Sequence, residues 1–182
     1  MYWKPSIPLV IAADQEIKGI GAQPADIVRV GIGNPHIDLL DAYVQRTTPK
    51  PHAVLNTGTA GGMGDTPGSI FVIDKVVDGT SQGRDPIELA VPEWAQDLPR
   101  RTVATVDHIV DDPAEHEALK AHAQLVDMEL YDLAVRCQAL GVELYSVKIV
   151  SDGADDGAYT TWLLVAEKIS QQLGAYLRKQ IG

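Results

Sequence analysis

Apolar positions follow two different spacings along the chain, and segments of the two kinds alternate. Short runs rich in Val, Ile and Leu predict buried strands, at residues 7–13, 27–32, 53–57, 69–77, 102–110 and 142–150. Apolar residues three and four positions apart predict amphipathic helices, at residues 36–46, 112–122, 129–140 and 161–180. Because strands and helices alternate, the pattern favours a layered α/β fold.

Turn and capping residues support several of these boundaries. Asp112 and Pro113 are typical of a helix start, and Gly141 is typical of a helix end. Residues 79–99 are rich in turn formers and predict a long irregular connection. The sequence has no internal repeat and no low-complexity linker, so we expect a single domain over residues 1–182.

The composition and the net charge limit the kinds of partner that the protein can bind. The hydrophobic share of 45% and the charged share of 22% are ordinary for a globular protein, which argues against disorder. The formal net charge is −10, and the densest basic cluster is Arg100-Arg101. Binding to a nucleic-acid backbone needs a basic face, so we expect no nucleic-acid partner. A small neutral or cationic ligand remains compatible.

Cysteine content and hydropathy suggest a cytoplasmic protein. Cys137 is the single cysteine, so no internal disulfide can form, and its place on an apolar helical face predicts packing rather than reactivity. The apolar run within residues 1–16 is too short and too soon interrupted for a signal peptide. No segment approaches a membrane span, so we expect no membrane partner.

Acidic residues follow the predicted strands or open a predicted helix. Glu16 follows the first strand, Glu129 begins a helix, and Asp152 follows the strand at 142–150. Ligands of open α/β sheets gather beyond the carboxyl ends of the strands, so these groups could converge on one cleft. Each also has a simpler interpretation: Glu16 as a solvated loop charge, Glu129 as an acid favoured by the helix dipole, and Asp152 as a turn cap. The glycine-rich stretch at 58–62 alone is only a weak signal of a ligand loop.

Three short motifs of the sequence, together with their order and separation, resemble those of a known family. They are "NTGTAGG" at 56–62, "VDMELYDLA" at 126–134 and "VSDGAD" at 150–155, with weaker agreement at "IAADQEI" and "VGIGN". Together they resemble the nucleoside phosphorylase superfamily, and within it the methylthioadenosine/S-adenosylhomocysteine nucleosidases, of which this chain would be a shortened member. The resemblance implies a three-layer α/β/α fold around a central mixed, twisted sheet.

The resemblance also implies roles for individual residues. Glu16 would activate the attacking water, and Asp152 would hydrogen-bond the purine and assist protonation at its N7. Glu129 would grip the ribose hydroxyls while Met128 packs against the sugar. Further substrate-binding positions would be the loop beside sugar and base, the residues sheltering the base, and an aromatic residue at the 5′ substituent: Thr59, Ala60, Gly61, Ile109, Val110 and Trp162.

These residue types suit cleavage of an N-glycosidic bond. The reaction builds positive charge on the sugar and negative charge on the departing base, so one carboxyl group must donate a proton while others remain anionic. Phosphorylases of the superfamily carry an arginine where this chain has Asn56, so we prefer a nucleosidase that releases free base and sugar. The alternatives are a phosphate-dependent phosphorylase and a catalytically silent nucleoside-binding protein.

The substrate and the assembly are expected by resemblance only. An adenosine thioether is our first expectation, and a deoxyadenosine or futalosine-like nucleoside is the next. Three departures bear on this: Asp127 is shorter than the usual glutamate, Ile109 replaces an aromatic residue, and His108 is either structural or a contact to an altered base. The histidines are scattered, and the pair His116 and His122 is expected to face solvent, so we expect no metal and no cofactor.

Members of the family commonly form dimers in which a neighbour closes the 5′ pocket. We therefore expect a homodimer, although the candidate closing region around Trp94 is shortened here.

Overall fold

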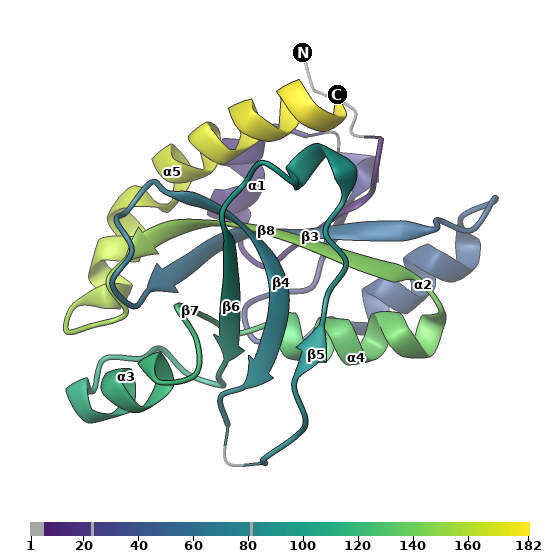
Figure 1. Cartoon of the computed structure of the whole chain (residues 1–182). Coiled ribbons are helices and arrows are strands. Elements are labelled where there is room, and N and C mark those ends of the chain that lie inside the picture. Colours follow the sequence, from purple (N-terminus) through teal and green to yellow (C-terminus); the bar gives the residue numbers. More distant parts are fainter. Residues whose placement is uncertain (1–5, 23, 81) are drawn as a thin grey trace.

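A computed structural model describes residues 6–22, 24–80 and 82–182 (Figure 1). Residues 1–5, which belong to the segment assessed above for a signal peptide, lie outside the described residues. Position 23 also lies outside them, as does position 81 within the predicted irregular connection.

The described residues form one mixed eight-stranded sheet, which lies between helices (Figure 1). In chain order its strands are β1 (Leu9–Ile11), β2 (Ile27–Arg29), β3 (Ala53–Gly62), β4 (Ile70–Asp78), β5 (Ile87–Glu88), β6 (Arg100–Thr105), β7 (Leu125–Asp127) and β8 (Glu143–Asp152). The order across the sheet is β2-β1-β3-β7-β6-β4-β5, with β8 paired to both β3 and β4. The pairings of β3, β8, β4, β6 and β7 close into a ring, which makes the sheet strongly curved.

Helices cover both faces of the sheet. The helix α1 (Asp14–Ile20) packs with the long α5 (Ala158–Ile181) on one face, and α2 (Asp38–Arg46) lies with α4 (Leu130–Leu140) on the other (Figure 1). The short α3 (Pro113–Lys120) follows β6, and two 3₁₀ turns lie at Pro24–Asp26 and Glu93–Ala95. None of the helices in the described ranges has the length and hydropathy to cross a bilayer.

Side-chain alternation in β1 explains the two cores. Leu9 and Ile11 are fully buried against the α1 and α5 side, whereas Val10 is fully buried on the α2 and α4 side. A strand that is apolar on both faces is typical of a sheet covered on both sides. The expectation of an α/β fold with a central mixed sheet is therefore confirmed.

Two predicted boundaries are wrong in ways that matter for function. The strand predicted to end at residue 57 continues through the glycine-rich stretch to Gly62, because β8 supplies a parallel partner along nearly its whole length. The strand predicted to reach residue 110 ends at Thr105, so Ile109 and Val110 lie in a loop.

Two of the short elements that were not predicted, α1 and β7, carry no strong sequence pattern. The helix α1 has only seven residues and is held by its packing against α5. The strand β7 has only three residues and pairs with both β3 and β6. Each is stabilised by tertiary contacts rather than by local propensity.

Candidate active site

The carboxyl ends of β1, β3, β6, β7 and β8 surround one cavity, together with the start of α5. Its empty space, including the mouth that is open to solvent, is about 690 Å³. All of the site residues proposed from the sequence line it: Glu16, Thr59, Ala60, Gly61, Ile109, Val110, Met128, Glu129, Asp152 and Trp162. Segments 130 residues and more apart thus meet at one place.

Glu16 lies in the first turn of α1 and is held by donors from two other segments. Its Oε1 accepts hydrogen bonds from the backbone N–H of Thr59 (2.6 Å) and from the Thr59 hydroxyl (2.8 Å), while Oε2 accepts one from the N–H of Ala13 (3.1 Å). The indole N–H of Trp162 donates to the same hydroxyl at 2.8 Å. A Cβ at Gly58 would lie 2.5 Å from Oε1, so only glycine allows this close approach.

Asp152 is the last residue of β8, and its side chain is buried beside β3. Its Oδ2 accepts from the Ser151 hydroxyl at 2.5 Å, and its Oδ1 accepts from the backbone N–H of Ala154 at 3.0 Å. Asp152 pairs in register with Gly61, where an added Cβ would approach Oδ1 to 3.2 Å. The carboxyl group is therefore fixed by the turn that follows the strand.

The turn after Asp152 also corrects one sequence expectation. Ala154 has a left-handed backbone conformation with φ of 51°, and its carbonyl accepts a hydrogen bond of 2.8 Å from Nδ1 of His116. His116 is half-buried and holds this turn, so the expectation that it faces solvent is wrong. His122 is exposed, as expected.

Glu129 occupies the N-cap position of α4, and its side chain is only 6% exposed. Its Oε1 accepts a 2.9 Å hydrogen bond from the N–H of Gly33, and its carbonyl accepts one of 2.8 Å from the Asn34 side chain. Burial, and then the nearby charge of Asp127, raise the pKa of Glu129 to about 7, against smaller lowering effects of Lys148 and the Gly33 amide. The ionisation of Glu129 is thus sensitive to its surroundings near neutral pH.

A buried ion pair adjoins the cavity, and one of its members, Asp127, is part of the cavity lining. The ammonium group of Lys148 lies 2.9 Å from Oδ2 of Asp127, and both side chains are almost fully buried. Burial alone would lower the pKa of Lys148, but the carboxylates of Asp127 and Glu129 raise it above its usual value. No motif of the sequence includes Lys148, although a lysine inside a largely buried strand is itself a signal of a partner.

Apolar and aromatic side chains complete the cavity. Tyr159 and Trp162 stack with ring centroids 6.2 Å apart, and Ile32 faces the same space. Neither Tyr159 nor Ile32 was proposed from the sequence. Tyr159 could have been found from its spacing of three residues from Trp162 if the helix start had been placed correctly.

His108 lies on the rim of the cavity in the loop after β6. Its Nδ1 is 2.7 Å from Asp107 and its Nε2 is 3.0 Å from Glu115. The hydrogen bonds to Asp107 and Glu115 raise the pKa of His108. The two carboxylates provide a structural role for this histidine, which still borders the cavity.

Three further expectations from the sequence concern a metal site, the reactivity of Cys137 and the position of Trp94. Across the described ranges, no group of three His, Cys, Asp or Glu side chains is arranged to hold a metal ion. Cys137 is buried in α4, and burial raises the pKa of its thiol to about 12. Trp94 packs in the core beside α5 and does not line the cavity.

The cavity combines an acidic set with an apolar side. Its described lining contains Glu16, Asp127, Glu129 and Asp152 but no Lys or Arg. Such a set can donate a proton, accept a proton and stabilise positive charge, which are the needs of a reaction through a cationic sugar.

A family model described as the phosphorylase superfamily matches residues 15–181. The chain belongs to the phosphorylase superfamily. A search of curated proteins gave no match.

Solved structures similar to this phosphorylase superfamily chain include nucleosidases. A futalosine hydrolase mutant of Helicobacter pylori is 20% identical with a TM-score of 0.79, covering 96% of this chain and 97% of that one. The D198N mutant of the H. pylori nucleosidase MTAN, with 5′-methylthioadenosine in its active site, is 18% identical with a TM-score of 0.80, covering 98% of both chains. The Streptococcus pneumoniae MTA/SAH nucleosidase with 8-aminoadenine is 20% identical with a TM-score of 0.77, covering 97% and 99%. At these identities the likeness shows the shared fold.

Proposed function

We propose that this chain is a purine nucleosidase that hydrolyses the N-glycosidic bond of an adenosine-type nucleoside, releasing the free base and the sugar. The observation that carries the proposal is the meeting of three buried acids, Glu16, Glu129 and Asp152, in the lining of one cavity. These acids come from three separate segments, and each is held by its own hydrogen bonds. An arrangement of this kind is costly to bury, which favours a catalytic purpose.

The proposed mechanism divides the chemistry between the two ends of the bond. Asp152 donates a proton to N7 of the purine, so that the base leaves as a neutral molecule. The sugar becomes cationic, and the carboxylates of Glu129 and Glu16 stabilise that charge. Glu129 also accepts hydrogen bonds from the ribose hydroxyls. Glu16 then takes a proton from a water molecule as the water adds to C1 of the sugar.

The polar lining supports water rather than phosphate as the nucleophile. Phosphate binding requires cations or several free N–H donors, and no Lys or Arg in the described chain lines the cavity. Asn56, where the phosphorylases carry arginine, is buried and donates to the carbonyl of Val10 at 3.3 Å. Lys148 is already paired with Asp127. A dianionic phosphate beside these carboxylates would be repelled.

The apolar side of the cavity supports a nucleoside whose 5′ substituent begins with an apolar thioether. Tyr159, Trp162, Ile32 and Met128 provide an apolar surface that would accept a thioether chain. We therefore propose methylthioadenosine or an S-adenosylhomocysteine-like compound as the substrate, in agreement with the ligand of the H. pylori nucleosidase structure. A futalosine-like nucleoside is the next candidate, since a futalosine hydrolase shares the fold.

The proposal is tested by incubating the purified protein with a panel of purine nucleosides, with and without phosphate, and by separating the products by chromatography. We expect free base at the same rate with and without phosphate, with 5′-methylthioadenosine among the best substrates. Base release that requires phosphate and yields ribose 1-phosphate would favour a phosphorylase. Binding detected by calorimetry without any base release would favour a silent nucleoside-binding protein.

We further propose that the single domain over residues 1–182 acts as a homodimer in the cytoplasm. Apolar side chains are exposed beside the mouth of the cavity, among them Ile109, Tyr159, Leu163 and Leu164. A second copy lying over this rim would cover them. Sedimentation velocity should give the mass of a dimer, and a monomer at micromolar concentration would contradict this part of the proposal.

A further inference from the structure

The start of α4 is capped in an unusual way. A helix leaves its first N–H groups without partners inside the helix, and the N-cap side chain usually accepts from one of them. Glu129 is the N-cap residue of α4, but its side chain accepts no such hydrogen bond. Its carboxylate turns instead towards the cavity and the N–H of Gly33. The free N–H groups of α4 must therefore find other acceptors.

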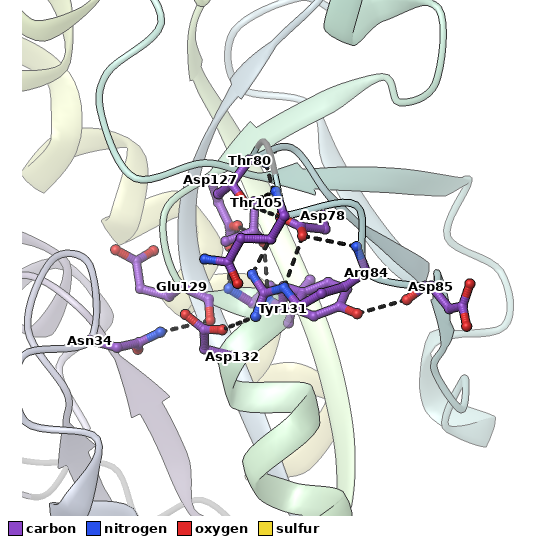
Figure 2. A network of polar contacts seen from close by, with 12 residues as sticks. Asn34, Asp78, Thr80, Arg84, Asp85, Thr105, Asp127, Glu129, Tyr131 and Asp132 are labelled. Atoms are coloured by element: carbon purple, nitrogen blue, oxygen red, sulfur yellow. Dashed lines mark hydrogen bonds and ion pairs between the residues drawn. The ribbon is translucent and has the colours of Figure 1, made fainter.

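Two side chains outside the helix provide them. The N–H of Leu130 donates to the carboxylate of Asp127 at 3.2 and 3.3 Å, and the N–H of Tyr131 donates to the hydroxyl of Thr105 at 3.0 Å. Thr105 is the last residue of β6 and is 3% exposed. Figure 2 shows Thr105, Asp127 and Tyr131 close together beside Glu129.

The same hydroxyl links the two capping groups. Thr105 donates its single hydrogen to Oδ1 of Asp127 at 2.7 Å, and its oxygen remains free to accept from Tyr131 (Figure 2). The other oxygen of Asp127 receives the ammonium group of Lys148 at 2.9 Å. The Asp127 carboxylate thus accepts from Thr105, Leu130 and Lys148, and the first turn of α4 is tied to β6, β7 and β8.

We propose that Thr105 is a positioning residue for Glu129: with Asp127 it caps α4, which leaves the Glu129 carboxylate available to the sugar of the substrate. The inference rests on the proposed function, because it assigns the use of Glu129 to sugar binding. Without the Thr105 hydroxyl, Asp127 would lose a donor, and the N–H of Tyr131 would lose its acceptor. The Glu129 carboxylate would then compete for the vacant N–H, which lies two positions after it in the first turn of α4.

Steady-state kinetics with 5′-methylthioadenosine test the proposal. Thr105→Val keeps the shape but removes the hydroxyl, and we expect KM to rise at least about tenfold, the effect of losing hydrogen bonds to a buried charged group, with a smaller change in kcat. Thr105→Ser restores the hydroxyl and should return KM to within about threefold of the wild-type value. Thr57→Val is the matched control, because the Thr57 hydroxyl is buried in β3 without a hydrogen-bond partner among the described residues. It should leave KM unchanged.

A folded Thr105→Val protein with the wild-type KM would overturn the proposal, and so would a Thr105→Ser protein as impaired as Thr105→Val. Amide hydrogen exchange of the wild type provides a readout that needs neither turnover nor a folded variant. The Tyr131 N–H should exchange as slowly as the buried amides of β6. Exchange at the rate of an exposed amide would also overturn the proposal. If the wild type cleaves no nucleoside but its Tyr131 N–H is protected, the proposed function fails while the capping arrangement stands.

Discussion

Replacement of Glu129 by glutamine should make the protein more stable above neutral pH. The carboxylate is buried, next to Asp127, and its pKa rises from 4.5 to about 7 on folding. Between these values the folded protein holds a proton that the unfolded chain has released, so the stability contributed by Glu129 is fully present below pH 4.5 and is lost as the pH rises through 7. Glutamine does not titrate, and its side-chain oxygen can still accept from Gly33.

The size of the effect follows from the shift. One pKa unit corresponds to 1.36 kcal/mol, so the rise in the pKa of Glu129 from 4.5 to about 7 amounts to about 3 kcal/mol in the free energy of unfolding. The stability of Glu129→Gln relative to the wild type should therefore increase by about 3 kcal/mol from pH 4.5 to pH 8. A buried residue that lowers the stability of the folded protein near neutral pH is expected at a site where function requires that residue.

Urea denaturation of both proteins at several pH values between 4.5 and 8.5 measures this difference. Glu143→Gln is a suitable control, since Glu143 lies at the exposed start of β8. A stability difference that does not change with pH, or that favours the wild type increasingly as the pH rises, would refute the reasoning. The variant should also bind nucleosides more weakly, because a neutral amide is a poorer acceptor for the ribose hydroxyls.

Three further substitutions test other parts of the structure. Gly58→Ala would place a Cβ 2.5 Å from Oε1 of Glu16, so base release should fall about a hundredfold in a folded protein, and an activity near that of the wild type would contradict the close approach. Trp162→Phe removes the donor that orients the threonine partner of Glu16, so kcat should fall about tenfold, whereas a change in KM alone would point to substrate contact only. Arg84→Met removes the ion-pair partner of the buried Asp78 side chain, so urea denaturation at pH 7 should show a loss of about 2 kcal/mol in the free energy of unfolding. Arg84 holds the pKa of Asp78 below its usual value of 3.8, so this loss should shrink as the pH falls below 3.8, and an equal loss at all pH values would count against the pairing.

Much of the fold could be predicted from the sequence because long elements carry long patterns. The strand β8 and the helix α4 were placed to within two residues by their apolar spacing and by Gly141. Among the missed elements, α1 and β7 are too short to carry a periodic pattern. They form because α5, β3 and β6 supply their contacts, and no local pattern encodes those partners.

The candidate site also contains residues that could be predicted from the sequence and residues that could not. Glu16, Glu129 and Asp152 could be proposed because each follows a strand or opens a helix within a sequence motif of the family. The roles of Lys148 and Thr105 could not, since a lysine in a buried strand indicates a partner without identifying it, and Thr105 stands at a strand end outside the family motifs. Their importance depends on the position of Asp127, which becomes visible only when the ring of strands brings residues of β6, β7 and β8 together.

A pair of leaving groups tests most directly whether Asp152 protonates the departing base. Purine ribosides need a proton on the base, whereas p-nitrophenyl riboside releases a stable anion without one. We expect Asp152→Asn to lose base release from 5′-methylthioadenosine by at least about a hundredfold while cleaving p-nitrophenyl riboside near the wild-type rate, and Glu16→Gln to be impaired on both substrates. Equal losses of Asp152→Asn on the two substrates, or full activity on the purine nucleoside, would contradict the account.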